Sequence, residues 1–177
     1  METFMALLRG INVSGQKKIK MADLKLALTE GGLSNVQTYI QSGNITFESE
    51  VQERADQERK IQKVILEEFG FEVPVLVLTS EQIESILSAN PFKSEEEKSL
   101  YFVLLKTAPQ SELVYEFNQQ KFANEDFHIT ERCVYLCCKA GYGKAKLSNN
   151  LVERKLKVEA TTRNLKTMMK LLEMTKV

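Results

Sequence analysis

Histidine is nearly absent from this chain, since His128 is the only one among 177 residues. Histidine is the usual proton carrier near neutral pH, so serine–histidine and cysteine–histidine catalytic schemes have one candidate base. Phe127 and Ile129 flank it in a pattern that alternates apolar and polar residues, which predicts a strand. The alternation puts His128 on the same exposed face as Asp126 and Thr130. We interpret His128 as a surface residue, because the sequence offers it no catalytic partner.

Cysteine is scarce as well, with only Cys133, Cys137 and Cys138. Their odd number, the lack of C-x-x-C spacing and the lack of a nearby histidine pair disfavour a disulfide framework and a zinc site. We therefore expect no metal, and we interpret the three thiols as small apolar side chains of a buried strand. Such cysteines fit a reducing compartment.

Long apolar runs and a basic leader segment are also missing. No run approaches the roughly 18 apolar residues that a membrane span requires. The opening residues Met1 to Leu8 contain an acid and no basic region, unlike a signal peptide. These absences predict a soluble, cytoplasmic protein.

Charge is balanced over the whole chain but uneven along it. Lysine plus arginine and aspartate plus glutamate number 24 each, so net charge gives no argument for binding nucleic acid or membranes. Residues 48–98 hold 6 basic and 13 acidic groups, whereas residues 139–177 hold 10 basic and 3 acidic groups. This division is typical of solvated helix faces, and it also fits one basic wall of a binding site.

The first half of the chain predicts the element order βαββαβ. The predicted segments are a strand at 4–8, a helix from 21 to the Gly31–Gly32 stop, strands at 36–40 and 45–47, a helix at 52–69 and a strand at 73–78. This order is typical of a split-βαβ, ferredoxin-like sandwich. A capped helix then runs to about Ala89 and stops before Pro91.

The second half predicts a similar βαββα order without a residue-level repeat. Its predicted strands are 100–105, 127–129 and 134–138, and its predicted helices are 110–121, 144–156 and 163–174. We therefore predict an α+β protein of two small ferredoxin-like (split βαβ) subdomains packed together, with one continuous sheet as the alternative. The predicted parts are residues 1–79, a connecting helix and loop at 80–98, and residues 99–177.

Two polar clusters in the second half are candidate anion sites. A strand ends at Cys138, and Gly141, Gly143 and Lys144 follow it, where backbone amides and a lysine can approach a phosphate. The spacing departs from the P-loop motif, and a plain strand-to-helix turn is the simpler interpretation. Thr161 to Asn164 form the other cluster, in which the threonines are predicted to cap the last helix and Arg163 to provide a cation. A simple cap with Arg163 in a surface ion pair is the preferred interpretation of this cluster.

Two further clusters lie in the first half. Arg9 and Asn12 follow the first strand and precede Lys17, Lys18 and Lys20, a loop position where small α/β proteins often bind ligands. The segment Gln41-Ser42-Gly43-Asn44 has the composition of a hairpin turn.

Four motifs together resemble a known family, the domain of unknown function 1697. They are Ala6-Leu7-Leu8-Arg9-Gly10-Ile11-Asn12-Val13, Thr38-Tyr39-Ile40-Gln41-Ser42-Gly43-Asn44, Asn90-Pro91-Phe92 and Thr161-Thr162-Arg163-Asn164. The resemblance covers about residues 3–174 and implies a bacterial-type cytosolic protein of two α+β subdomains, with no established activity. The sequence departs from the family pattern at Ser14, Ala145 and Leu165, where glycine, serine and tryptophan are usual.

These observations leave three functions open, and none requires a cofactor. The first is binding of a small phosphorylated ligand in a basic cleft between the subdomains, with or without catalysis. The residues assigned to that site are Arg9, Asn12, Lys17, Ser42, Asn44, Lys144, Arg163 and Asn164. The second is a non-catalytic protein–protein interaction module, and the third is RNA binding through exposed aromatics such as Tyr39, Tyr135 and Tyr142.

Overall fold

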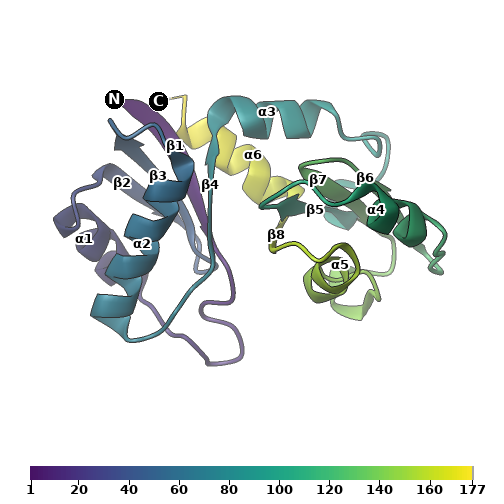
Figure 1. Cartoon of the computed structure of the whole chain (residues 1–177), viewed down its shortest axis with the longest axis horizontal. Coiled ribbons are helices and arrows are strands. Elements are labelled where there is room, and N and C mark those ends of the chain that lie inside the picture. Colours follow the sequence, from purple (N-terminus) through teal and green to yellow (C-terminus); the bar gives the residue numbers. More distant parts are fainter. Residues whose placement is uncertain (177) are drawn as a thin grey trace. The chain divides into compact units, whose positions relative to one another are not determined.

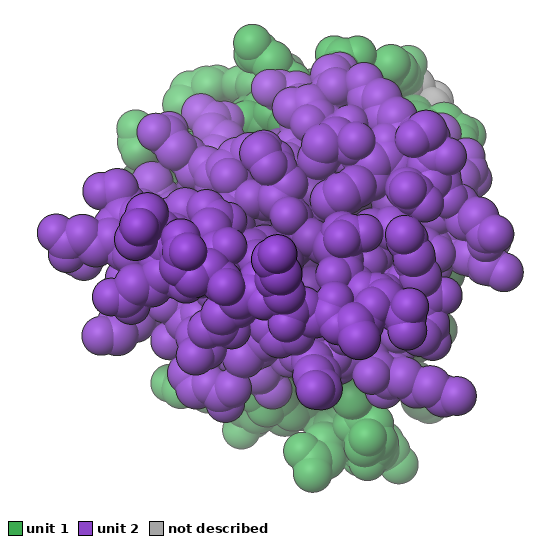
Figure 2. Space-filling model, turned by 90° about the vertical axis from the view of Figure 1, so that its right-hand side faces the viewer, with its two compact units in different colours: residues 1–84, 170–177 green, residues 85–169 purple. Residues whose placement is uncertain are grey.

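The chain is a mixed α+β protein that divides into two compact units (Figure 2). The computed structural model describes residues 1–176. The first unit contains Met1–Glu84 and the chain from Lys170 onward, and the second contains Ser85–Met169. The divisions therefore fall inside two helices, α3 (Ser80–Ser88) and α6 (Leu165–Met174). Across the described residues, no helix combines the length and apolarity needed to cross a bilayer.

The first unit contains one antiparallel sheet with two helices packed on one of its faces (Figure 1). In chain order its elements are β1 (Glu2–Leu8), α1 (Met21–Glu30), β2 (Ser34–Tyr39), β3 (Asn44–Ser49), α2 (Arg54–Phe69) and β4 (Val75–Thr79). The strand order β2-β3-β1-β4 is that of a split-βαβ sandwich. Phe4, Ala6 and Leu8 alternate along β1 and form the core with apolar residues of α1 and α2.

The second unit has the same topology. Its elements are β5 (Leu100–Leu105), α4 (Ser111–Asn118), β6 (Glu125–Ile129), β7 (Cys133–Cys138), α5 (Asn149–Leu156) and β8 (Ala160–Asn164), with short 3₁₀ turns at Glu97–Ser99 and Tyr142–Lys144. The strand order is β6-β7-β5-β8, and every pairing is antiparallel. The predicted α+β class with two ferredoxin-like sandwiches is therefore confirmed.

Two predicted helix boundaries in the second unit were wrong. The helix expected at 144–156 begins at Asn149, because Ser148 is its N-cap and accepts a hydrogen bond from the Leu151 amide at 3.1 Å. Residues 160–164, expected to contain a helix cap and first turn, form the edge strand β8. Five residues of mostly polar sequence carry too little apolar alternation to indicate a strand, and pairing with β5 decides their conformation.

Equivalent residues of the two sheets make equivalent backbone hydrogen bonds, although the sequences of the two units show no repeat. The Leu8 amide donates to the Gly43 carbonyl at 2.8 Å, and the Leu105 amide donates to the Arg132 carbonyl at the same distance. One residue further on, the Arg9 amide donates to Pro74 at 3.1 Å and the Lys106 amide donates to Glu159 at 2.9 Å. The pairing of β1 with β4 is therefore the same, residue for residue, as the pairing of β5 with β8.

Helix caps and edge strands repeat in the same way. Thr79 and Asn164, at equivalent strand ends, accept hydrogen bonds from amides three residues later and begin α3 and α6. Glu58 accepts the outward amide of Val77 on the edge strand β4 at 3.0 Å, and Glu153 accepts that of Ala160 on β8 at 2.9 Å. A helix carboxylate thus satisfies an edge-strand donor in each unit.

The connections between elements are where the two units differ. Residues 9–20 join β1 to α1, whereas the shorter segment 106–110 joins β5 to α4. Conversely, residues 139–148 join β7 to α5, whereas residues 50–53 join β3 to α2. Each unit therefore has one long loop that the other unit folds without.

All three cysteines lie in β7 and are buried, as predicted. Burial, as the largest cause, together with the nearby Glu125 and Cys137 raises the pKa of the Cys138 thiol from 9.0 to about 11. Burial also raises the pKa values of Cys133 and Cys137. The thiols are therefore protonated at neutral pH and are poor nucleophiles.

We expect the free energy of unfolding to fall as pH rises from about 9 to about 11. The unfolded chain loses the Cys138 proton near its ordinary pKa of 9.0, whereas the folded chain holds it until about 11. The stabilisation is therefore complete below pH 9 and is lost at up to about 1.4 kcal/mol per pH unit in this window. Urea unfolding followed by circular dichroism at several pH values measures the slope. Cys138→Ala should make it shallower, and an unchanged slope would contradict the assignment.

Candidate functional site

The long loop of the first unit has an unusual backbone. Five of its residues have positive φ: Gly10, Asn12, Ser14, Gly15 and Lys17. Ser14 and Gly15 form a tight turn that the Gln16 amide closes on the Val13 carbonyl at 2.9 Å. The Asn12 amide donates to the Lys17 carbonyl at 3.1 Å, so the loop folds into a small hairpin of its own.

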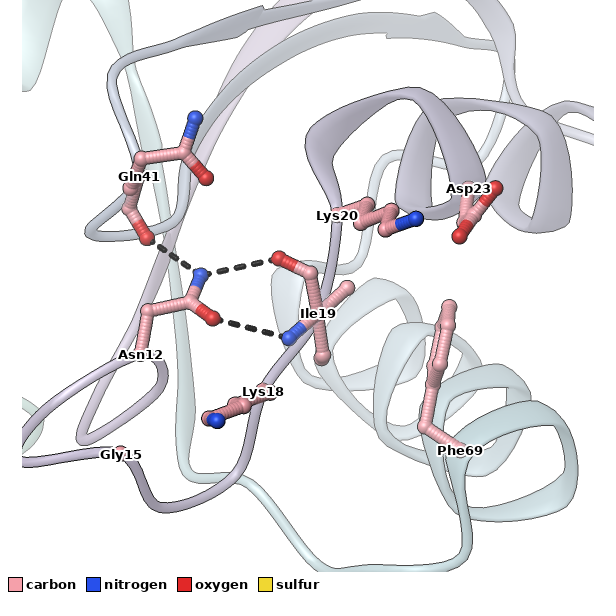
Figure 3. A pocket seen from close by; sticks show the side chains of 8 residues that line it. All are labelled: Asn12, Gly15, Lys18, Ile19, Lys20, Asp23, Gln41 and Phe69. Carbon is pink, nitrogen blue, oxygen red and sulfur yellow. Dashed lines mark hydrogen bonds between the residues drawn. The ribbon is translucent and has the colours of Figure 1, made fainter.

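The Asn12 side chain fixes this loop to two other segments (Figure 3). Its amide nitrogen donates to the Ile19 carbonyl at 2.9 Å and to the Gln41 carbonyl at 2.8 Å. Its amide oxygen accepts from the Ile19 backbone amide at 2.9 Å. Both N–H donors of Asn12 are therefore used inside the protein, and its role is to position the loop.

The Gln41–Asn44 motif forms the turn between β2 and β3 through a close backbone approach. Gly43 has φ +86°, and a Cβ built on it would lie 2.6 Å from the Cβ of Leu8. The buried Asn44 side chain donates to the Tyr39 carbonyl at 3.0 Å and to the Ser42 hydroxyl at 2.8 Å. Ser42 and Asn44 therefore hold the turn that accepts the Asn12 hydrogen bond.

A recess of about 580 Å³ opens beside this loop in the first unit, a volume in the range of small-molecule sites. Figure 3 shows the side chains that line it: Asn12, Gly15, Lys18, Ile19, Lys20, Asp23, Gln41 and Phe69. They come from the loop, the first turn of α1, the β2–β3 turn and the last residue of α2. All of them belong to one unit, so folding of that unit builds the recess.

Two cations of the recess are without a charged partner in the described structure. Lys18 and Lys20 are exposed and form no ion pair within 4 Å with any acid among residues 1–176. The neighbouring Lys17 instead donates to the Glu72 carbonyl at 2.7 Å. Lys20 is also the N-cap of α1, where its side chain makes no capping hydrogen bond.

The glycine loop of the second unit holds an internal carboxylate. The amides of Lys146 and Leu147 donate to the two oxygens of Glu125 at 3.1 and 2.8 Å. The amides of Gly141 and Ala145 donate to the carbonyls of Cys138 and Tyr142. These donors, which a phosphate would need, are thus already occupied, while Lys144 is exposed at the end of a 3₁₀ turn.

The cluster at Thr161–Asn164 belongs to strand β8 and its helix cap. The Thr162 hydroxyl donates to the Asn149 side chain at 2.8 Å, and the Asn164 side chain accepts from the Thr167 amide at 2.9 Å. Arg163 donates to the Thr162 carbonyl at 2.9 Å, and burial lowers the pKa of its guanidinium to about 10. Arg163 therefore remains cationic at neutral pH.

The eight predicted site residues divide between the two units. Arg9, Asn12, Lys17, Ser42 and Asn44 lie in the first unit, where Asn12 joins the loop to the turn that contains Ser42. Lys144, Arg163 and Asn164 lie in the second unit. Arg9 and Arg163 are both engaged with other groups of the protein. That these residues bind a ligand in one shared cleft stays a prediction.

Sequence reasoning left several recess residues out of the assigned site. For Lys18 and Lys20, the indication in the sequence was their place in a lysine-rich loop. Asp23 and Phe69 carried no signal, because an acid in a first turn and an inward-facing helix residue are both ordinary. For Gln41, the only indication in the sequence was its position in a predicted turn.

Metal and histidine chemistry find no support in the part of the chain that the structure describes. Within residues 1–176 there is no group of three or more histidine, cysteine, aspartate or glutamate side chains placed to hold a metal ion. His128 and Asp126 are exposed on β6, as the alternation predicted.

We expect Gly43→Ala to lower the free energy of unfolding by about 3 kcal/mol. The added methyl group would meet Leu8 and Ile11 at under 3 Å, and the φ of +86° strains any other residue. Gly70→Ala is the matched control, because its φ of +80° is similar but no atom lies within 4 Å. It should cost only about 1 kcal/mol. Equal losses in urea unfolding would show that the close approach is unimportant.

We expect Glu125→Ala to lower the free energy of unfolding by about 2 kcal/mol. The substitution removes a charged acceptor from two backbone amides. Asp126→Ala is the control, since Asp126 makes only an exposed ion pair with Lys139 at 3.8 Å and should cost less than about 0.5 kcal/mol. Urea denaturation measures both, and a Glu125→Ala protein as stable as the control would rule out this role.

Comparison with known proteins adds a family and a solved structure of similar fold. A conserved bacterial protein, SP0830 from Streptococcus pneumoniae, has a similar structure with a TM-score of 0.72 and 26% sequence identity. The alignment covers 98% of each chain. No curated protein matches this sequence.

The family comparison covers residues 1–84 of the first unit and the second unit as far as the first half of β7. The family's sequence model, described as "Protein of unknown function (DUF1697)", matches residues 1–135. This range includes the recess and excludes Lys144, Arg163 and Asn164. The match spans most of the chain, and the protein therefore belongs to the DUF1697 family.

Proposed function

We propose that this protein binds a small phosphorylated ligand in the recess beside loop 9–20 of its first unit. The observation that carries the proposal is the pair Lys18 and Lys20, which line the recess and form no ion pair with the described acids. Because these two lysines outnumber Asp23, the one acid among the residues that line the recess, the recess carries a net positive charge that attracts an anion.

The start of α1 adds to this positive field. The first amides of a helix have no intrahelical acceptor, and the helix dipole places partial positive charge there. Lys20 at the N-cap adds a full charge at the same end and offers no capping oxygen. A bound phosphate would satisfy the free amides and offset the repulsion between lysine and dipole.

The loop is also an addition that the fold does not require. The second unit makes the corresponding connection with residues 106–110 and reaches the same sheet topology. Three hydrogen bonds of Asn12 nevertheless tie the longer loop to Ile19 and to the β2–β3 turn. A loop that is dispensable for topology but anchored by such bonds is typical of a binding element, because preorganisation lowers the entropy cost of binding.

Of the three tyrosines considered for RNA stacking, Tyr135 is buried, Tyr142 is stacked on another ring and Tyr39 is half-buried at the end of β2. Phe102 and Tyr135, aromatic residues of the second sheet, are buried with 1% and 2% of their surfaces exposed. Tyr142 is stacked on Tyr101 with ring centroids 4.6 Å apart. Stacking on single-stranded RNA needs open aromatic faces, so these rings do not provide a platform.

A thermal-shift titration at low salt tests the proposal with inorganic phosphate, pyrophosphate, ribose 5-phosphate and adenosine monophosphate. We expect at least one to raise the unfolding midpoint, since saturation at 100 times the Kd adds about 2.7 kcal/mol. Lys18→Gln and Lys20→Gln should each weaken binding about tenfold, the loss of one charge-assisted contact.

Two control variants locate the site. Lys25→Gln removes an exposed charge of the same helix outside the recess and should leave binding unchanged. Lys144→Gln should also leave it unchanged, whereas a loss there would place the ligand at the second unit's glycine loop. Failure of all four anions to bind, or equal binding by a Lys18→Gln/Lys20→Gln double variant, would refute the proposal.

A further inference from the structure

The recess contains side chains that a bare phosphate does not use. Phe69 and Ile19 line it beside the two lysines. In Figure 3 the Phe69 ring is seen edge-on, below Lys20 and Asp23 and with one face turned toward Ile19. Phe69 is only partly buried against the core, so part of the ring remains exposed. This surface matches the apolar, planar part of a ligand.

Asp23 is the second feature that inorganic phosphate does not explain. Its carboxylate lines the recess from the first turn of α1, on the same side as Lys20 in Figure 3. An ionised carboxylate only accepts hydrogen bonds, and it repels an anion at close range. A ligand that uses Asp23 must therefore bring hydroxyl or N–H donors at some distance from its negative charge.

We infer that the recess binds a nucleoside monophosphate, an inference that rests on the proposed function and names its ligand class. The phosphate lies in the positive field of Lys18 and Lys20, whose ammonium groups point in different directions in Figure 3. The ribose hydroxyls or a base amino group donate to Asp23, and the base packs on Phe69. A sugar phosphate lacks the planar apolar part, and a nucleoside lacks the anion. A nucleotide uses all three kinds of side chain that line the recess.

Isothermal titration of the full chain compares adenosine, guanosine, cytidine and uridine monophosphates with adenosine, ribose 5-phosphate and inorganic phosphate. We expect at least one nucleotide to bind at least fivefold more tightly than ribose 5-phosphate, the lower limit for stacking a base on an aromatic ring. Adenosine should bind more weakly than its monophosphate, because it cannot engage the lysines.

Variants of the aromatic residue test the base contact. Phe69→Leu keeps an apolar side chain but removes the ring, and it should weaken nucleotide binding at least fivefold while leaving ribose 5-phosphate unchanged. Phe71→Leu is the matched control, since Phe71 packs on the same core cluster but does not line the recess. Equal unfolding midpoints for the two variants establish that a difference in binding is local.

Asp23→Asn provides an independent test, because it should change the affinities for a nucleotide and for inorganic phosphate in opposite directions. It should weaken nucleotide binding and strengthen inorganic phosphate binding, since it removes both the charged acceptor and the repulsion. Ribose 5-phosphate or phosphate that binds as tightly as every nucleotide, with no effect of Phe69→Leu, would overturn the nucleotide inference and leave the phosphate site intact. Absence of binding by every anion would overturn the proposed function as well.

Discussion

The hydrogen bonds of the Asn12 side chain are the constraint on which the candidate site depends. One amide group joins both ends of the long loop through Ile19 and fastens them to the β2–β3 turn through Gln41. This turn depends on two of its own residues. The Gly43 carbonyl accepts a hydrogen bond from the last amide of β1, and the Asn44 side chain donates to Tyr39 and Ser42 across the turn. Motifs far apart in the chain thus form one scaffold, and the lysines of the recess are carried on it.

The repeated backbone register separates what the fold needs from what has been added to it. Both units have paired strands, capped helices and a helix glutamate that accepts an amide of the edge strand. The side chains that meet these requirements differ, because a threonine and an asparagine cap a helix equally well. A long loop that occurs in one unit alone is not explained by these requirements, and it is there that a function is to be sought.

The two long loops provide different acceptors for their backbone amides. The loop of the second unit encloses the carboxylate of Glu125, a built-in anion that satisfies its amides. In the loop of the first unit, the Asn12 side chain accepts the Ile19 amide, and the amides of Asn12 and Gln16 donate to loop carbonyls. Lys18 and Lys20 line the recess beside Phe69. An acid of the neighbouring strand β6 thus accepts loop amides in the second unit, whereas a side-chain amide accepts one in the first.

The sequence by itself determined the α+β class, the order of elements in the first unit, the buried cysteines and the turn at Gln41–Asn44, because periodicity and turn chemistry are local. It also marked the lysine-rich loop. It did not reveal β8, whose conformation comes from pairing with β5, nor the internal role of Asn12, whose partners lie up to 29 residues away. The tertiary structure alone brought Asp23, Gln41 and Phe69 beside Lys18 and Lys20, because only packing places a helix end, a turn and a loop around one recess.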